Sequence, residues 1–254
     1  MNILYLNNNE KFIAYNKHNA TKKKAPYVIF IHGFMSNMHG DKAIYLEQYC
    51  IEQDYNFIRF DNFGCGDSYG SFADQTISTW QQGLQMIINM IDGPIILVGS
   101  SLGAWVAFIS VIKNPDKISG IVTIAAAFDF TQELIYEKLS PKQMKQLDES
   151  GSCNFSGSDK NCSHIYPISK DLIEDGRQHL LLSKEEININ CPIHLIHGMQ
   201  DFDVPYSISM RAINILKSQN IVFKLIKDGD HRLSRAQDLK IICNSIEEII
   251  NSLI

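Results

Sequence analysis

The sequence predicts an α/β fold built on a mostly parallel, doubly wound sheet of eight strands. Short apolar runs alternate with helix-like segments along most of the 254 residues, which is the order that parallel strands and crossover helices require. One strand–turn–helix junction contains Gly99-Ser-Ser-Leu-Gly103, and one long stretch, residues 129–190, interrupts the alternation. A chain of this length with 45% hydrophobic residues can bury a single large core.

The elements follow from hydrophobic periodicity. Residues 3–6 and 11–15 alternate apolar and polar side chains, as in an antiparallel hairpin. Six further strands are expected at residues 27–31, 56–60, 95–98, 118–125, 193–197 and 222–226. Helices are expected around residues 42–53, 77–91, 104–112, 207–218 and 236–253.

Ser101 is the candidate nucleophile. It occupies the centre of a G-x-S-x-G motif between a strand and a helix, the setting in which a sharp turn presents a serine hydroxyl at the end of a strand. The two glycines are needed because side chains there would collide with the neighbouring strand and helix. Cys65 lacks this setting and is expected to be a buried, inert thiol.

A nucleophilic serine needs a base and an orienting acid, which follow it along the chain in this type of fold. Of the eight histidines, only His231 follows the final predicted strand. Asp201 follows the strand before it, and the Val-Pro pair at 204–205 is expected to anchor its loop and start the next helix. Asp203 is a close competitor for the acid, and Asp129 a more distant one. The predicted triad is Ser101, Asp201 and His231.

The first central strand, residues 27–31, runs into His32-Gly33-Phe34. This turn is expected to supply the backbone N–H of Phe34 to an oxyanion hole, with the N–H of Leu102 as the second donor. Apolar side chains close to the site in the sequence are candidates for an acyl pocket, although each is equally suited to ordinary core: Met35, Met38, Phe128, Tyr136 and Met199.

Residues 129–190 divide the predicted core into residues 1–128 and 191–254. About sixty residues are too many for a plain connection. Because the insertion follows the sixth strand at the carboxyl edge of the sheet, it predicts a small cap over the nucleophile. The polar residues 151–163 are an alternative candidate for a disordered surface loop.

Five motifs resemble those of the α/β hydrolases along nearly the full chain. They are His32-Gly-Phe34, residues 61–68, Gly99–Gly103, residues 197–205 and residues 230–234. Residues 196–199, 171–177 and 230–232 are similar in particular to the mitochondrial abhydrolase family of palmitoyl-protein thioesterase and mycophenolic acid acyl-glucuronide esterase. This resemblance implies the same triad and S-acyl or acyl-glucuronide substrates. The chain is expected to differ from that family in lacking a mitochondrial leader.

The composition of the chain argues against several classes of function. A net charge of −5 and a pI near 5.9 provide no basic field for nucleic acid. No apolar stretch approaches the length of a membrane span, and the N-terminus does not resemble a signal peptide, which predicts a cytoplasmic protein. Six cysteines without a C-x-x-C pair argue against structural zinc and suit reduced thiols. Lys outnumbers Arg 18 to 5, which suggests an AT-rich, bacterial genome.

The predicted function is a serine hydrolase that cleaves small-molecule carboxylic esters or thioesters without a metal or organic cofactor. An aminopeptidase-like serine peptidase and a non-catalytic binding protein of the same fold are the alternatives. The oligomeric state does not follow from the residues.

Overall fold

The strands of the protein form one large and one small sheet. The computed structural model describes residues 1–6, 10–22, 25–156, 165–218 and 220–253. The strands of the large sheet are β1 (Asn2–Tyr5), β2 (Phe12–His18), β3 (Tyr27–Ile31), β4 (Asn56–Phe60), β5 (Ile95–Ser100), β6 (Ile118–Ile124), β9 (Ile193–Gly198) and β10 (Ile221–Ile226). The small sheet consists of β7 (Ser152–Ser156) and β8 (Ile165–Ser169).

The large sheet has the strand order β1-β2-β4-β3-β5-β6-β9-β10. β1 and β2 are antiparallel, β2 pairs antiparallel with β4, and the remaining neighbours are parallel. The predicted eight-stranded, mostly parallel sheet is therefore confirmed. β4 and β5 are buried on both faces, which explains why β5 begins in the sequence as a continuous apolar run instead of an alternating one.

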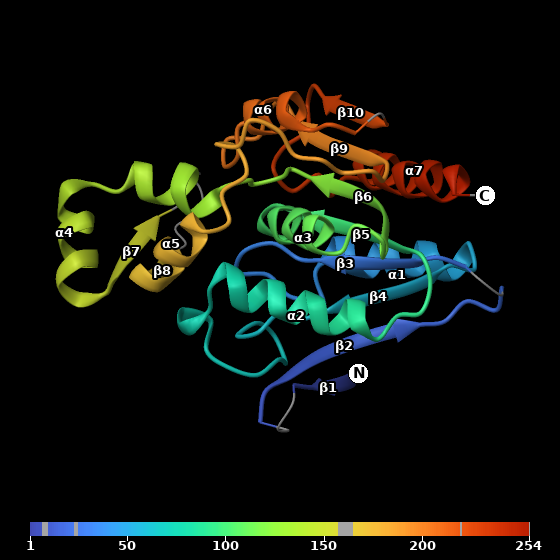
Figure 1. The fold of residues 1–254 in the computed structure, drawn as a ribbon, viewed down its shortest axis with the longest axis horizontal. Coiled ribbons are helices and arrows are strands. Elements are labelled where there is room, and N and C mark those ends of the chain that lie inside the picture. Colours follow the sequence, from blue (N-terminus) through green and yellow to red (C-terminus); the bar gives the residue numbers. More distant parts are fainter. Residues whose placement is uncertain (7–9, 23–24, 157–164, 219, 254) are drawn as a thin grey trace.

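Helices cover both faces of this sheet (Figure 1). They are α1 (Asp41–Glu52), α2 (Ile77–Asn89), α3 (Leu102–Lys113), α4 (Pro141–Ser150), α5 (Lys170–Arg177), α6 (Ser207–Ile215) and α7 (Ala236–Ser252), with short 3-10 helices at Phe72–Asp74 and Tyr136–Lys138 and a π-helix at Thr131–Ile135. Residues of α2, α3 and α6 belong to one buried apolar cluster, and residues of α1 and α7 belong to a second. The sheet thus separates two core layers, as a doubly wound fold requires.

α6 ends three residues before its predicted end at residue 218, and α5 is a short helix. α6 stops at Ile215 because Leu216 turns extended and forms a bridge with Ile187. α5 stops at Arg177, and the backbone N–H groups of Leu181 and Leu182 donate to the carboxylate of Asp129 instead. Side-chain and tertiary partners here replace the bonds that a longer helix would have made.

The segment between β6 and β9 contains α4, α5 and the β7–β8 hairpin, which project beyond the carboxyl ends of the parallel strands (Figure 1). α4 begins directly after Ser140, which is its N-cap. Residues 152–156 form β7, so this part of the polar stretch is a paired strand. The expectation of disorder for the rest, residues 157–163, lies outside the described residues.

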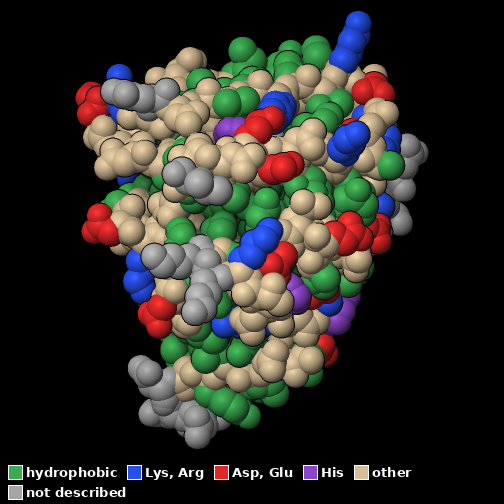
Figure 2. Space-filling view, turned by 90° about the vertical axis from the view of Figure 1, so that its right-hand side faces the viewer, with side chains coloured by type: hydrophobic (Ala, Val, Ile, Leu, Met, Phe, Trp, Pro, Cys, Tyr) green, Lys and Arg blue, Asp and Glu red, His purple; other side chains and the backbone are tan. Residues whose placement is uncertain are grey.

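The surface in Figure 2 mixes acidic and basic side chains with apolar ones, and neither sign of charge dominates this face. Within the described residues, no helix is both long enough and apolar enough to cross a membrane. The cysteines at 50, 65, 153, 191 and 243 are unpaired. Burial raises the pKa of the Cys65 thiol to about 12, which is the opposite of what activates a nucleophilic cysteine.

Candidate active site

Ser101 lies at a strained turn between β5 and α3. Its φ is 54° and its ψ is −120°, a conformation that a residue other than glycine adopts at a cost of about 1–3 kcal/mol. A Cβ at Gly103 would overlap the carbonyl oxygens of Ile31 and His32, and a Cβ at Gly99 would overlap the backbone at Ala104. The close approach of these backbones therefore explains both glycines of the motif.

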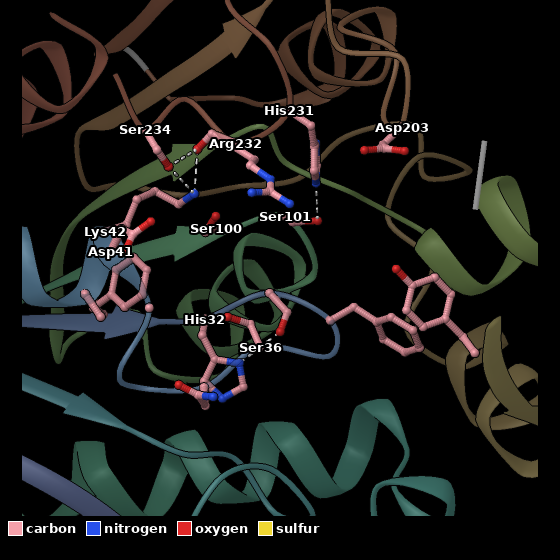
Figure 3. A pocket seen from close by; sticks show the side chains of 17 residues that line it. His32, Ser36, Asp41, Lys42, Ser100, Ser101, Asp203, His231, Arg232 and Ser234 are labelled. Atoms are coloured by element: carbon pink, nitrogen blue, oxygen red, sulfur yellow. Dashed lines mark hydrogen bonds between the residues drawn. The ribbon is translucent and has the colours of Figure 1, made fainter. Parts of the chain in front are cut away.

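Three side chains from three loops meet at this turn. His231 follows β10, and its Nε2 lies 3.1 Å from Ser101 Oγ (Figure 3). Asp201 follows β9, and its Oδ2 lies 2.7 Å from His231 Nδ1. The N–H of Gln200 donates to the carbonyl of Gly229 at 2.9 Å, so the loop of the acid is bonded directly to the loop of the histidine. The structure thus places the three predicted residues in hydrogen-bonding contact.

Asp201 is almost fully buried, at 6% exposure. Burial by itself raises the pKa of this carboxyl, but hydrogen bonds from His197 and His231 outweigh it and hold the pKa at about 2. The Oδ1 atom accepts the backbone N–H groups of Asp203 at 3.0 Å and Val204 at 2.8 Å. The group is therefore a permanently charged acceptor at neutral pH.

The two competing acids have other surroundings. Asp203 lines the cavity beside Ser101, and its side chain lies apart from the Ser101–His231 bond in Figure 3. Asp129 is 2% exposed and accepts the N–H groups of Leu181 and Leu182. Burial raises the pKa of Asp129. Its contacts join the start of the inserted segment to its end, which is a structural role.

The turn after β3 lies against the nucleophile, since a Cβ at Gly33 would approach Ser101 Cβ to 3.2 Å. His32 holds this turn: its Nδ1 bonds to the carbonyl of Gly33 and its Nε2 accepts the N–H of Asn62. Burial lowers the pKa of His32, which suits a neutral ring with its proton on Nδ1. Among the described residues, neither the N–H of Phe34 nor that of Leu102 donates to a protein acceptor.

A cavity of about 350 Å³ opens beside Ser101 and His231. Within the described part of the chain it is lined by Phe30, His32, Gly33, Phe34, Ser36, Asn37, Gly40, Asp41, Lys42, Ala43, Ser100, Ser101, Tyr166, Asp203, His231, Arg232 and Ser234. Tyr166 belongs to the inserted hairpin, and its ring meets Phe34 edge-on with centroids 5.5 Å apart. The inserted segment therefore contributes one wall of the cavity.

The five predicted pocket residues do not line this cavity. Met38 and Phe128 have 0% and 1% exposure and belong to the core. Phe128 packs edge-on against Phe108. Met35 and Met199 are exposed at the surface, and Tyr136 packs under the guanidinium of Arg177. Closeness in sequence to the turn misled the prediction, because backbone direction and not sequence distance decides which side chains face the serine.

Two cations that the sequence analysis did not place in the site line the cavity instead. Lys42, at the start of α1, donates its Nζ to the carbonyl of Arg232 and lies 3.5 Å from Ser234 Oγ. In the view of Figure 3 the Arg232 guanidinium lies between Lys42 and Ser101. Burial, reinforced by the charge of Arg232, lowers the pKa of Lys42 against the opposing effect of Asp230. The sequence does indicate that Arg232 lies near the site, because it directly follows the predicted base His231.

Asp201, Asp203 and His231 also present ligand-type atoms within 4.8 Å of one another, as do His39, Asp61 and Asp67. In the first group, His231 Nδ1 and Asp201 Oδ2 bond to each other. In the second, the buried Asp61 carboxylate accepts the N–H groups of Met38 and Asp67. Both groups are explained by these internal bonds.

Comparisons with known proteins agree with this architecture. A family model described as serine aminopeptidase S33 matches residues 22–154. The mitochondrial palmitoyl-protein thioesterase ABHD10 of Mus musculus is 34% identical over 91% of this chain and 77% of its own length. The Homo sapiens protein of the same name is 34% identical over 95% of this chain and 77% of its own length.

Two solved structures match over nearly their whole length. A putative hydrolase from Agrobacterium vitis has a TM-score of 0.90 and 32% identity, covering 98% of this chain and 97% of its own. The mouse α/β hydrolase domain-containing protein 10 has a TM-score of 0.89 and 32% identity, covering both chains completely.

The sheet order, the strained serine turn and these matches define the class of the protein. The chain belongs to the α/β-hydrolase family. Within that family it is similar to palmitoyl-protein thioesterase ABHD10, so the resemblance predicted from the sequence is confirmed.

Proposed function

We propose that the protein is a serine hydrolase that cleaves carboxylic esters or thioesters through an acyl-enzyme on Ser101. The observation that carries the proposal is the line of contacts from Ser101 Oγ through His231 to Asp201 Oδ2, at 3.1 Å and 2.7 Å. It borders the cavity, where a substrate carbonyl can reach the serine. Relatives named as thioesterases support the same reaction class.

In the acylation step, His231 Nε2 takes the proton of the Ser101 hydroxyl as Oγ attacks the substrate carbonyl carbon. The carbonyl oxygen becomes an oxyanion, and the N–H groups of Phe34 and Leu102 donate to it. The tetrahedral intermediate collapses, the bond to the leaving oxygen or sulfur breaks, and His231 returns its proton to that atom. Asp201 stabilises the imidazolium and holds its orientation throughout.

Deacylation repeats the sequence with water. His231 removes a proton from the water molecule as its oxygen attacks the acyl carbon, and the same two N–H groups bind the oxyanion. Collapse releases the carboxylic acid and returns the proton to Ser101 Oγ. The scheme assigns every proton transfer to His231 and needs no metal or organic cofactor.

The lining of the cavity favours a polar leaving group. The leaving atom must lie within reach of His231 to receive its proton, and Lys42 and Arg232 line the space beside His231. Asp41 and Asp203 also line it and partly offset the two cations. A carboxylate or phosphate on the leaving group would accept bonds from Arg232, whose planar donors suit such oxyanions.

The Arg232→Gln variant should lose about tenfold in kcat/KM on an anionic substrate, such as an acyl-glucuronide or acyl-coenzyme A, through the loss of one charge-assisted contact. A neutral p-nitrophenyl ester of the same acyl group should be cleaved at nearly the original rate. Lys227→Gln is the matched control, since Lys227 is exposed on the same loop and does not line the cavity. Equal losses on both substrates would remove Arg232 from substrate recognition.

A substrate panel tests the reaction class itself. We expect p-nitrophenyl esters of two to sixteen carbons or a palmitoyl thioester to have higher kcat/KM than an aminoacyl p-nitroanilide. Resonance stabilises ester and thioester carbonyls less than amide carbonyls, so they are attacked more readily. The described residues that line the cavity do not favour an amide substrate. An anilide that is the best substrate would favour the peptidase named in the matching family model.

Small-molecule acyl esters or thioesters are therefore the proposed partners. The cytoplasmic location, the bacterial source and the lack of nucleic-acid binding stay predictions, and the matched mammalian relatives are named as mitochondrial.

A further inference from the structure

His197 is a fully buried histidine at the end of β9, four residues before Asp201. Its Nε2 lies 2.9 Å from the carbonyl oxygen of Val204 and 3.2 Å from Asp201 Oδ2. Its Nδ1 lies 2.8 Å from Ser209 Oγ on α6. Both ring nitrogens therefore have partners, and one of those partners is the proposed catalytic acid.

These partners determine where the ring carries its proton. A carbonyl oxygen can only accept, so Nε2 carries a proton. This N–H group is directed at the acid loop, toward Val204 and Asp201. Nδ1 is paired with the Ser209 hydroxyl, which can donate or accept and holds the far side of the ring.

The Asp201 carboxylate is consequently surrounded by donors. Two backbone N–H groups hold Oδ1, and His231 and His197 both approach Oδ2, at 2.7 Å and 3.2 Å. Rotation of the carboxylate about its χ2 angle would break bonds at both oxygens. The acid is thus held in the one orientation that faces His231.

We infer that His197 is a positioning residue of this hydrolase, which acts through Asp201 to orient His231. The inference rests on the proposed function, because orientation matters to catalysis only if Asp201 and His231 act on Ser101. A purely structural role, in which His197 joins β9 to α6 through Ser209, predicts lost stability and an unchanged active enzyme. The structural role depends on Nδ1, which contacts Ser209, whereas the positioning role depends on Nε2, which contacts Asp201.

A pair of amide substitutions separates the two nitrogens. The side-chain nitrogen of Gln reaches about as far as Nε2, and that of Asn about as far as Nδ1. We expect His197→Asn to lower kcat on a p-nitrophenyl ester by on the order of 10- to 100-fold with KM little changed. His197→Gln should restore most of the loss, and the rate of fluorophosphonate labelling should follow kcat in both variants.

His194→Asn and His194→Gln are the matched controls, since His194 is buried in the same strand, 4% exposed, and faces Glu248. These controls should alter melting temperature without altering kcat per labelled site. Equal kcat in the two His197 variants, or a lower kcat for Gln than for Asn, would overturn the inference. If the Asn variant does not fold, Ser209→Ala decides, because it removes the bond that holds Nδ1 and with it the orientation of the ring. It should lower kcat in the same direction, whereas unchanged kcat would refute the role.

The wild-type protein keeps this test separate from that of the function. If the wild type does not label with the fluorophosphonate, the proposed function fails. If it labels and the His197 variants retain full kcat, the function stands and the positioning role fails.

Discussion

Replacement of Ser101 by alanine is expected to give a folded protein that neither hydrolyses esters nor reacts with a fluorophosphonate. Loss of the nucleophile typically costs about 10⁶-fold in turnover, because triad members act as a unit. The fold should persist, because the contacts that hold residue 101 come from its backbone. Its N–H donates to the carbonyl of Ile124, and its carbonyl accepts the N–H groups of Ala104 and Ala127.

Ser100→Ala is the control for this experiment. Ser100 is the last residue of β5, lines the same cavity and carries the same hydroxyl. Its variant should label and turn over nearly as the wild type does, with circular dichroism confirming that both variants are folded. A Ser101→Ala protein that still labels would show that the nucleophile is another residue.

The strands of the central sheet were predictable because their burial leaves a plain signal. β3 and β4 begin and end at the predicted residues, since each is rich in apolar residues and bounded by polar residues or turns. β5 continues two residues beyond its predicted end, because Gly99 and Ser100 pair in register with Thr123 and Ile124 of β6. Because these two residues are small and not strongly apolar, a search for apolar runs does not detect the last part of this strand.

The proposed triad could be predicted from the sequence because of the topology of the sheet. Parallel strands bring their carboxyl ends to one edge of the sheet, so loops after β5, β9 and β10 meet although they are far apart in the chain. Sequence order then distinguishes the acid from the base. From the sequence, His197 is interpreted as a packing or turn residue, because a histidine at the end of a strand gives no indication of which loop its ring nitrogens face.

The residues that line the cavity could not be predicted from the sequence in the same way. Lys42 and Arg232 are separated by 190 positions, and only the packing of α1 beside the loop after β10 brings them together. The inserted hairpin was missed for a related reason: Cys153 and Ile168 face each other in register and are buried, but the polar residues around them weaken the alternation. Side-chain direction in such segments depends on tertiary partners.

The acid offers a second large effect, in which two neighbouring carboxylates are predicted to behave differently. Asp201→Asn should lower kcat by on the order of 10⁴-fold, the cost of fixing the wrong histidine tautomer. Two backbone N–H groups donate to Oδ1, so the amide oxygen of the variant must take that position. Its NH₂ group then occupies the position of Oδ2 and points at His231 Nδ1. The His231 proton is driven to Nε2, which can no longer accept the proton of Ser101.

Asp203→Asn removes the same charge two residues away and should leave kcat nearly unchanged, since its contribution to the acid loop is a backbone N–H that the variant keeps. The measurement is kcat on a p-nitrophenyl ester for both variants, normalised to active sites by fluorophosphonate titration of the wild type and to folded protein by circular dichroism. Equal losses, or a larger loss for Asp203→Asn, would exclude Asp201 as the acid. The comparison is sharp because both variants have the same net charge, so a general change in the field of the cavity would affect both alike. Only a specific bond to His231 Nδ1, present at 2.7 Å for Asp201, predicts that they differ.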